Sequence, residues 1–197
     1  KLLANLRATN PALANSTMQI RYAKDYLLAI SKKDDVENRE YVVAFNNSNK
    51  AIKATISTAT SKGGWKLLMG KTTVKAVGEK ITMTVPPLST IVLKANQVID
   101  KTNVKVGKIS SDLDFLTGYY ETKASVTTQD MAKVTFYIRS AGDQSWSSLG
   151  TDTNSPYMVY VDPLEYEGKT VEVKATAVNS KGAKYELPST SILIPAP

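Results

Sequence analysis

The spacing of apolar residues changes once near the start of the chain, from a helical to an alternating pattern. Leu2, Leu3 and Leu6 have the spacing of an amphipathic helix. Asn10 precedes Pro11, and a residue before proline disfavours the α region, so the helix is expected to end there. From Met18 onward apolar and polar residues alternate, which is typical of half-buried strands. The pattern predicts one short N-terminal helix, at about residues 1–10, followed by β-structure.

The strands predicted for the first half of the chain are short and are separated by turn-forming residues. They cover residues 18–22, 26–31, 41–45, 51–58, 80–85 and 90–93. Residues 41–45 form a nearly continuous apolar run, as expected for a central strand that is covered on both faces. The charged residues 32–39 are interpreted as a solvated loop. Short strands with frequent turns indicate an antiparallel sandwich.

The second half of the chain carries a second set of strands. Seven are predicted, at residues 105–109, 119–127, 133–139, 145–149, 157–161, 170–178 and 184–194. Seven strands in about 95 residues are typical of an immunoglobulin-like sandwich. The charge balance changes across the polar residues 96–103, from +9 over residues 1–98 to −2 over residues 99–197. The sequence therefore predicts an all-β chain of two consecutive antiparallel β-sandwiches, residues 1–97 and 98–197.

Composition argues against catalysis by this chain. Its 197 residues include no cysteine and no histidine, which removes thiolate chemistry, the commonest general base and the commonest transition-metal ligand. Asp34, Asp35 and Glu37 lie beside lysines and are interpreted as a solvated turn. Asp112 and Asp114 lack the further oxygen ligands that calcium needs. We therefore predict that this chain is not an enzyme and has no metal and no cofactor.

The basic residues do not suggest a nucleic-acid partner. The net charge is +7, but no run of five like charges occurs, and the lysines are spread along the predicted strands. No apolar run is long enough to span a membrane. Neither nucleic acid nor a membrane is predicted as a partner.

Four segments of the first half resemble the C-terminal β domain of glycoside hydrolase family 13, the α-amylase family, which has a Greek-key fold. They are residues 6–13 (LRATNPAL), 42–48 (VVAFNNS), 65–70 (WKLLMG) and 85–93 (VPPLSTIVL). The first is similar to the end of the last helix of the catalytic barrel. The second half resembles immunoglobulin or fibronectin type III-like modules, through residues 134–137, Trp146, 149–152, 156–157 and 177–182.

The resemblance implies an accessory role. The α-amylase family is understood to cleave glucosidic bonds on a (β/α)₈ barrel, which takes roughly 250 residues and has no room here. The chain would then be a non-catalytic C-terminal region of an enzyme acting on starch or another α-glucan. Its first domain would pack on its own upstream barrel through Leu2, Leu6 and Leu13. The resemblance also implies an extracellular or periplasmic location, because polysaccharides too large to import are digested outside the cell.

Direct contact with polysaccharide is a second hypothesis. Exposed aromatic rings bind the apolar faces of sugars, and Trp65, Trp146, Tyr119 and Tyr120 are the candidates. Tyr119 and Tyr120 are adjacent in a predicted strand, so they point to opposite faces and one of them is expected to face outward. Against this, large aromatic residues in small β domains usually belong to the core. A free-standing carbohydrate-binding or protein-binding (adhesion) module remains the alternative.

Overall fold

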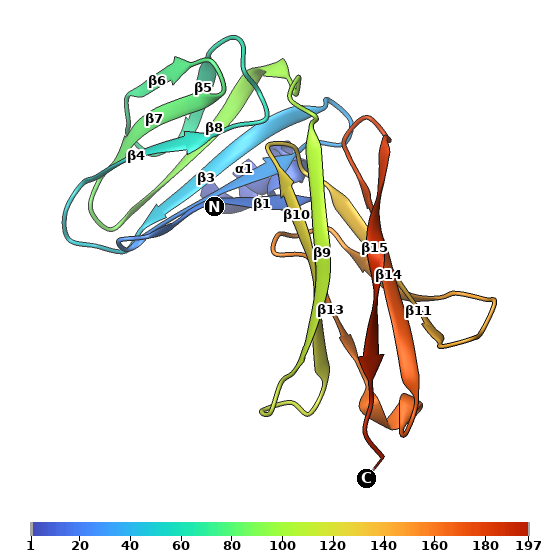
Figure 1. Cartoon of the computed structure of the whole chain (residues 1–197). Helices are drawn as coiled ribbons and strands as arrows, with labels where there is room; N and C mark the ends of the chain where they lie inside the picture. Colours follow the sequence, from blue (N-terminus) through green and yellow to red (C-terminus); the bar gives the residue numbers. More distant parts are fainter. Residues whose placement is uncertain (1, 197) are drawn as a thin grey trace. The chain divides into compact units, whose positions relative to one another are not determined.

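The computed structural model describes residues 2–196, apart from the side chain of Leu2. The chain divides into two compact units (Figure 1). The first comprises Lys1–Asn103 together with Gln129–Met131, and the second comprises Val104–Thr128 together with Ala132–Pro197. Within residues 2–196, no helix is long and apolar enough to cross a membrane.

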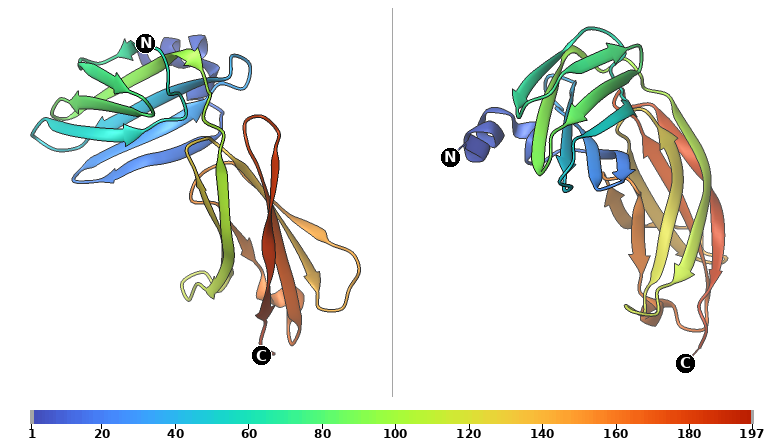
Figure 2. Two further views of the ribbon diagram at one scale, coloured as in Figure 1. Left: turned by 45° about the horizontal axis from the view of Figure 1, so that its top comes forward. Right: turned by 90° about the vertical axis from the view of Figure 1, so that its left-hand side faces the viewer.

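The first unit begins with helix α1 (Leu2–Thr9) and a 3-10 turn, η1 (Pro11–Leu13), and continues as two antiparallel sheets. The five-stranded sheet has the order β1-β2-β3-β8-β5, formed by Met18–Lys24, Leu27–Lys33, Arg39–Asn46, Ser89–Val98 and Trp65–Met69. The three-stranded sheet has the order β4-β7-β6, formed by Ile52–Ser57, Lys80–Val85 and Val74–Val77. Helix α1 lies on the side of the five-stranded sheet that faces away from the three-stranded sheet (Figure 2).

The core of the first unit lies between its two sheets. The five-stranded sheet contributes Leu27, Ala29, Val42, Ala44, Ile91 and Leu93, and the three-stranded sheet contributes Ala54, Ile56, Ile81, Met83 and Val85. These residues alternate along their strands with residues that point away from the core, as the pleat of a strand requires. The unit is therefore a β-sandwich with one buried layer of side chains.

The second unit is also a sandwich of two antiparallel sheets. The three-stranded sheet has the order β13-β10-β9, formed by Met158–Val161, Tyr120–Thr128 and Val104–Leu113. The four-stranded sheet has the order β12-β11-β14-β15, formed by Ser147–Asp152, Lys133–Ser140, Thr170–Val178 and Lys184–Leu193. A 3-10 turn, η2 (Pro163–Tyr166), connects β13 to β14. Phe136, Ile138, Val171 and Val173 are fully or almost fully buried between the sheets.

The prediction of an all-β chain is confirmed, and α1 is the one α-helix of residues 2–196. Three details of the first unit differ from the prediction. Strand β5, Trp65–Met69, was not predicted. Strand β6 was not predicted, because Val74–Val77 is a four-residue edge strand whose side chains are mostly exposed and show no clear alternation. The predicted strand at residues 90–93 extends over Ser89–Val98, since Ala95 pairs with Trp65 of β5 and Val98 pairs with Arg39 of β3 beyond a register shift.

Candidate functional site

The outer face of the five-stranded sheet carries an apolar row that runs across all five strands. The row consists of residues paired in register from β1 to β5, namely Ile20, Ile30, Val43, Val92 and Met69. Paired residues of antiparallel strands point to the same face. Val42 and Leu93, which neighbour two members of this row along the chain, point into the core, so the row points away from it. The outer face of a sandwich is usually polar, and an apolar row there indicates a face that is built to be covered.

Helix α1 and turn η1 cover part of this face and leave an apolar groove of about 280 Å³ beside it. Leu6 and Leu13 line the groove, as does Leu3, which is 61% exposed. On the sheet side the groove is lined by four members of the apolar row, all except Ile20, and by Phe45, which is 42% exposed. Of the three residues predicted at a domain interface, the structure places Leu6 and Leu13 together in this groove; the side chain of Leu2 lies outside the described residues.

Asn10 holds the helix against the sheet. Its side-chain amide donates a hydrogen bond to the carbonyl of Leu6, at 2.9 Å, and so satisfies one of the unpaired carbonyls at the end of α1. Its side-chain oxygen accepts a hydrogen bond from the hydroxyl of Tyr41, at 3.1 Å. Tyr41 lies on β3 and is fully buried. The residue that precedes proline and ends the helix therefore also ties the helix to the central strand.

Two cations line the same groove. Arg7 comes from α1 and Lys32 from β2, where Lys32 pairs in register with Tyr41 of β3. No carboxylate among residues 2–196 forms an ion pair with either side chain. Burial, and then the charge of Arg7, lower the pKa of Lys32 below its usual value. The groove is therefore apolar in its lining and positive in its charge.

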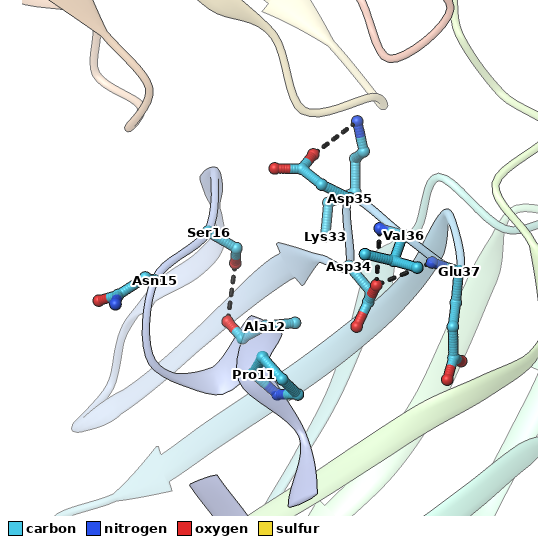
Figure 3. Close-up of a pocket in the computed structure, with 9 residues that line it drawn as sticks. All are labelled: Pro11, Ala12, Asn15, Ser16, Lys33, Asp34, Asp35, Val36 and Glu37. Carbon is cyan, nitrogen blue, oxygen red and sulfur yellow. Dashed lines mark hydrogen bonds and ion pairs between the residues drawn. The ribbon is translucent and has the colours of Figure 1, made fainter. Parts of the chain in front are cut away.

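A second pocket, of about 400 Å³, lies beside the charged loop that follows β2 (Figure 3). Asp34 is only 8% exposed, and its Oδ1 accepts hydrogen bonds from the backbone N–H groups of Val36 and Glu37, at 2.9 and 2.8 Å. Lys33 pairs with Asp35 at 3.0 Å. The interpretation of this loop as a solvated turn is wrong for Asp34, whose carboxylate is buried because it holds the backbone of the turn.

The carboxylates of this loop do not form a hydrolytic pair. Glu37 Oε2 lies 3.3 Å from Arg39 Nε and 2.6 Å from Lys94 Nζ, so it is already neutralised. Retaining glycosidases need two carboxyl groups about 5 Å apart in a cleft, one of them with a raised pKa. In residues 2–196, no group of three or more acidic, histidine or cysteine side chains is arranged to hold a metal ion. The loop is a structural turn.

A buried ion pair inside the first sandwich was missed by the sequence analysis. Arg21 Nη2 lies 3.2 Å from Glu40 Oε1, and both side chains are almost fully buried. Ser31 Oγ and the backbone N–H of Thr60 also donate to Glu40, at 2.5 and 2.9 Å. Burial raises the pKa of Glu40, although Arg21 opposes the shift. The available signal was Arg21 itself, which breaks the alternation between Ile20 and Tyr22; the strand register shifts there.

The four aromatic residues predicted for sugar contact do not form a common surface. Trp65 belongs to the first unit and packs against its core, and Tyr120 packs against the core of the second unit. Tyr119 faces outward and is 41% exposed. The ring of Trp146 is covered by two cations, with Arg139 Cζ at 4.4 Å and Lys174 Nζ at 4.6 Å from the ring centroid. Trp146 is thus neither part of the core nor an open aromatic platform.

The hairpin between β9 and β10 exposes two apolar side chains that the sequence analysis also missed. Phe115 is 91% and Leu116 is 98% exposed. Asp114 fixes the turn, because its carboxylate accepts hydrogen bonds from the N–H of Leu116 and the hydroxyl of Thr117, at 3.0 and 2.9 Å. These hydrogen bonds lower the pKa of Asp114. The two apolar side chains are therefore held outward by an ordered turn.

The first unit is thus an all-β domain with an apolar, positively charged outer face and no assembled pair of catalytic carboxylates among its described residues. Residues 21–96 match the family described as alpha amylase, C-terminal all-beta domain, so this part of the chain is similar to that family. The resemblance noted in its sequence is confirmed.

One relative and two solved structures extend the comparison. The chain is 35% identical over 187 residues to an alpha-amylase of Streptomyces lividans, and the match covers 91% of this chain and 20% of the relative. This chain thus spans about a fifth of that relative's length. A debranching enzyme of Nostoc punctiforme is 25% identical over 47% of this chain and 18% of its own (TM-score 0.38). A gamma-CGTase of alkalophilic Bacillus clarkii is 14% identical over 98% of this chain and 42% of its own (TM-score 0.39). At these TM-scores neither structure adds to the assignment.

Proposed function

We propose that this chain is the non-catalytic C-terminal region of an α-amylase-type glycoside hydrolase that acts on starch or another α-glucan. In this proposal the first sandwich docks on the catalytic barrel through the outer face of its five-stranded sheet. The observation that carries the proposal is the apolar outer face, where Ile20, Leu28 and Phe45 remain 36–42% exposed beside the in-register row. Two findings support the barrel as the occupant: the match of residues 21–96 to an alpha-amylase C-terminal domain family, and the four-fifths of the relative that this chain does not cover.

The energetics of the face favour a permanent cover. Large apolar side chains stay accessible there, among them Leu3, Leu28 and Phe45. Complete burial of one such side chain contributes about 1.5–3 kcal/mol relative to leaving it exposed. Several such side chains on one face add their contributions. This total is enough to hold two parts of one polypeptide together, because they do not lose the translational and rotational entropy that two separate molecules lose on binding.

The test uses the full-length protein that contains this chain. Phe45→Asp places a charge on the docking face, and Phe115→Asp is the matched control on an exposed hairpin tip in the second unit. We expect the wild-type protein and Phe115→Asp to unfold the barrel and the first sandwich in one calorimetric transition. Phe45→Asp should give two separate transitions. If both variants unfold like the wild type, the apolar face does not dock the barrel.

We propose that the second unit is an immunoglobulin-like module that acts as a spacer or docking domain. The pairing of a three-stranded sheet with a four-stranded sheet, in the orders given above, supports this assignment. Contact with starch is a further proposal, and Tyr119 is the most open of the four predicted aromatic side chains. Retardation of the chain in a starch-containing native gel, lost in Tyr119→Ala, is the expected result; unaltered migration of the wild type would contradict it. An extracellular or periplasmic location is proposed on the same basis, since starch is digested outside the cell.

A further inference from the structure

Arg7 and Lys32 are unusual cations because of where they lie. Both line the apolar groove between α1 and the five-stranded sheet, together with Leu6 and Leu13. Lys32 is half-buried. A cation on an open surface is stabilised by water, but a cation in an apolar groove loses that hydration as soon as the groove is covered. The two side chains also have the same charge. A purely apolar cover would therefore bury two positive charges with no negative charge to neutralise them.

A second lysine on the same sheet face shows what such a cation gains from an acidic partner. Lys32 pairs in register with Tyr41, and Tyr41 pairs in register with Lys94. Lys94 Nζ lies 2.6 Å from Glu37 Oε2. Burial alone would lower the pKa of Lys94, but hydrogen bonds with Glu37 and Tyr41 raise it above its usual value. Lys94 is thus compensated within the first unit, whereas residues 2–196 provide no ion pair for Lys32 or Arg7.

We infer that the surface covering this groove presents a carboxylate, from an aspartate or a glutamate, to Arg7 and Lys32. This inference rests on the proposed function, because the occupant it assumes is the catalytic barrel. One carboxylate between the two side chains would neutralise the local charge and offset the desolvation of Lys32. The apolar row would then supply contact area, while the carboxylate would fix the orientation of the helix and the sheet against the barrel.

Zero-length carbodiimide cross-linking of the full-length protein tests the inference. This reagent joins a lysine amine directly to a carboxylate in contact with it, so the cross-link identifies both residues by mass spectrometry. We expect Lys32 to be linked to an aspartate or glutamate of the barrel. Lys32→Arg should abolish that cross-link while keeping the charge. Lys53 is the matched control: it is an exposed lysine on β4, in the other sheet, and should form no link to the barrel.

Docking is followed separately, by the rate at which hydroxyl radicals oxidise Phe45. Lys32→Glu should weaken docking about tenfold, because the introduced charge repels the carboxylate, and Lys53→Glu should leave it unchanged. If Phe45 is protected in the full-length protein but Lys32 gives no barrel cross-link and Lys32→Glu docks normally, this inference is overturned and the proposed function stands. A cross-link from Lys32 to a second copy of this chain also overturns it. If Phe45 stays fully reactive, both the inference and the proposed docking fail.

Discussion

The two sandwiches present different outer faces, although their strands follow the same alternation. On the five-stranded sheet of the first unit, the outward row contains Ile30, Val43 and Val92 in register. On the four-stranded sheet of the second unit, the outward positions of β11 and β14 pair threonine with threonine, tyrosine with lysine, and arginine with glutamate. Arg139 Nε and Glu172 Oε2 lie 2.6 Å apart. The second face satisfies its own polar groups, whereas on the first face Val43 and Val92 are buried and Leu28 and Phe45 remain partly exposed.

This difference shows what alternation alone can and cannot decide. A period of two predicts a strand on either sheet, because one side of each strand meets a core. The alternation does not tell whether the outer side of a strand is covered by other residues of the same unit. The ring of Trp146 is covered in this way, by Arg139 and Lys174. The ring of Phe45 is not fully covered and remains 42% exposed.

The largest expected effect comes from comparing two of the arginine–glutamate pairs, Arg21–Glu40 and Arg139–Glu172. Arg21→Met leaves Glu40 buried without its cation and should lower the free energy of unfolding of the first sandwich by about 3–5 kcal/mol. Arg139→Met removes a partly exposed ion pair and the contact of Arg139 with the Trp146 ring, and should cost about 1–2 kcal/mol. Urea denaturation followed by tryptophan fluorescence measures both. Equal losses would show that the pair in the first sandwich is not buried as described.

Substitution of the two tryptophans should also cost more stability in the first sandwich than in the second. Trp65 packs against the core of the first sandwich, so Trp65→Ala should cost about 3 kcal/mol, at the low end for a buried aromatic residue because its ring is only partly covered. Trp146→Ala loses two cation–π contacts and should cost about 1–2 kcal/mol. Thermal unfolding monitored by circular dichroism gives the ranking. A larger loss for Trp146 would reverse the roles given to the two rings.

Phe45 and Phe115 should differ most when the barrel is present. In the 197-residue chain alone, Phe115→Asp should change the free energy of unfolding by about 0.5 kcal/mol or less, because its ring is 91% exposed, and Phe45→Asp should cost about 1 kcal/mol, because its ring is partly covered. In the full-length protein only Phe45→Asp should be destabilising, by about 2 kcal/mol from the apolar contact it loses. A large loss for Phe45→Asp in the isolated chain would mean that Phe45 supports the sandwich itself.

The pH dependence of the first sandwich should carry the signature of Glu40. The pKa of Glu40 is raised above its usual value of 4.5 in the folded chain, so the folded state binds the proton more tightly than the unfolded state. The contribution of Glu40 to stability is therefore fully present below about pH 4.5 and is lost as the pH rises through its folded pKa. Glu40→Gln should reduce this loss. Urea denaturation from pH 4 to 8 measures it, and parallel curves for both proteins would contradict the assignment.

The sequence predicted those features that depend on neighbouring residues. Alternation located β14 at Thr170–Val178, and the position of Pro11 placed the end of α1 near Asn10. Features that depend on strand pairing could not be found this way. Arg21 turns inward only because the register of β1 shifts beside it, and Glu40 reaches it from β3.

The residues of the candidate site also fall into two groups, those that the sequence could predict and those that depend on strand pairing. Leu6 and Leu13 could be proposed from the resemblance to the end of a barrel helix. The apolar row could not, because Val92 and Met69 join Ile30 and Val43 only through the pairing of β8 with β3 and β5. The cations over Trp146 likewise require β11 and β14 to be neighbours. Residues that are distant in sequence come together through the sheet order, and a single sequence does not contain that order explicitly.

The most direct test of the account compares side-chain oxidation by hydroxyl radicals in the 197-residue chain and in the full-length protein. Phe45 and Met69 report on the apolar face, Phe115 is the exposed reference, and the fully buried Phe136 is the protected reference. We expect the reactivity of Phe45 and Met69 to fall sharply in the full-length protein, with Phe45 close to Phe136, while Phe115 is unchanged. If Phe45 and Met69 react equally fast in both proteins, the outer face of the first sandwich is not a docking surface.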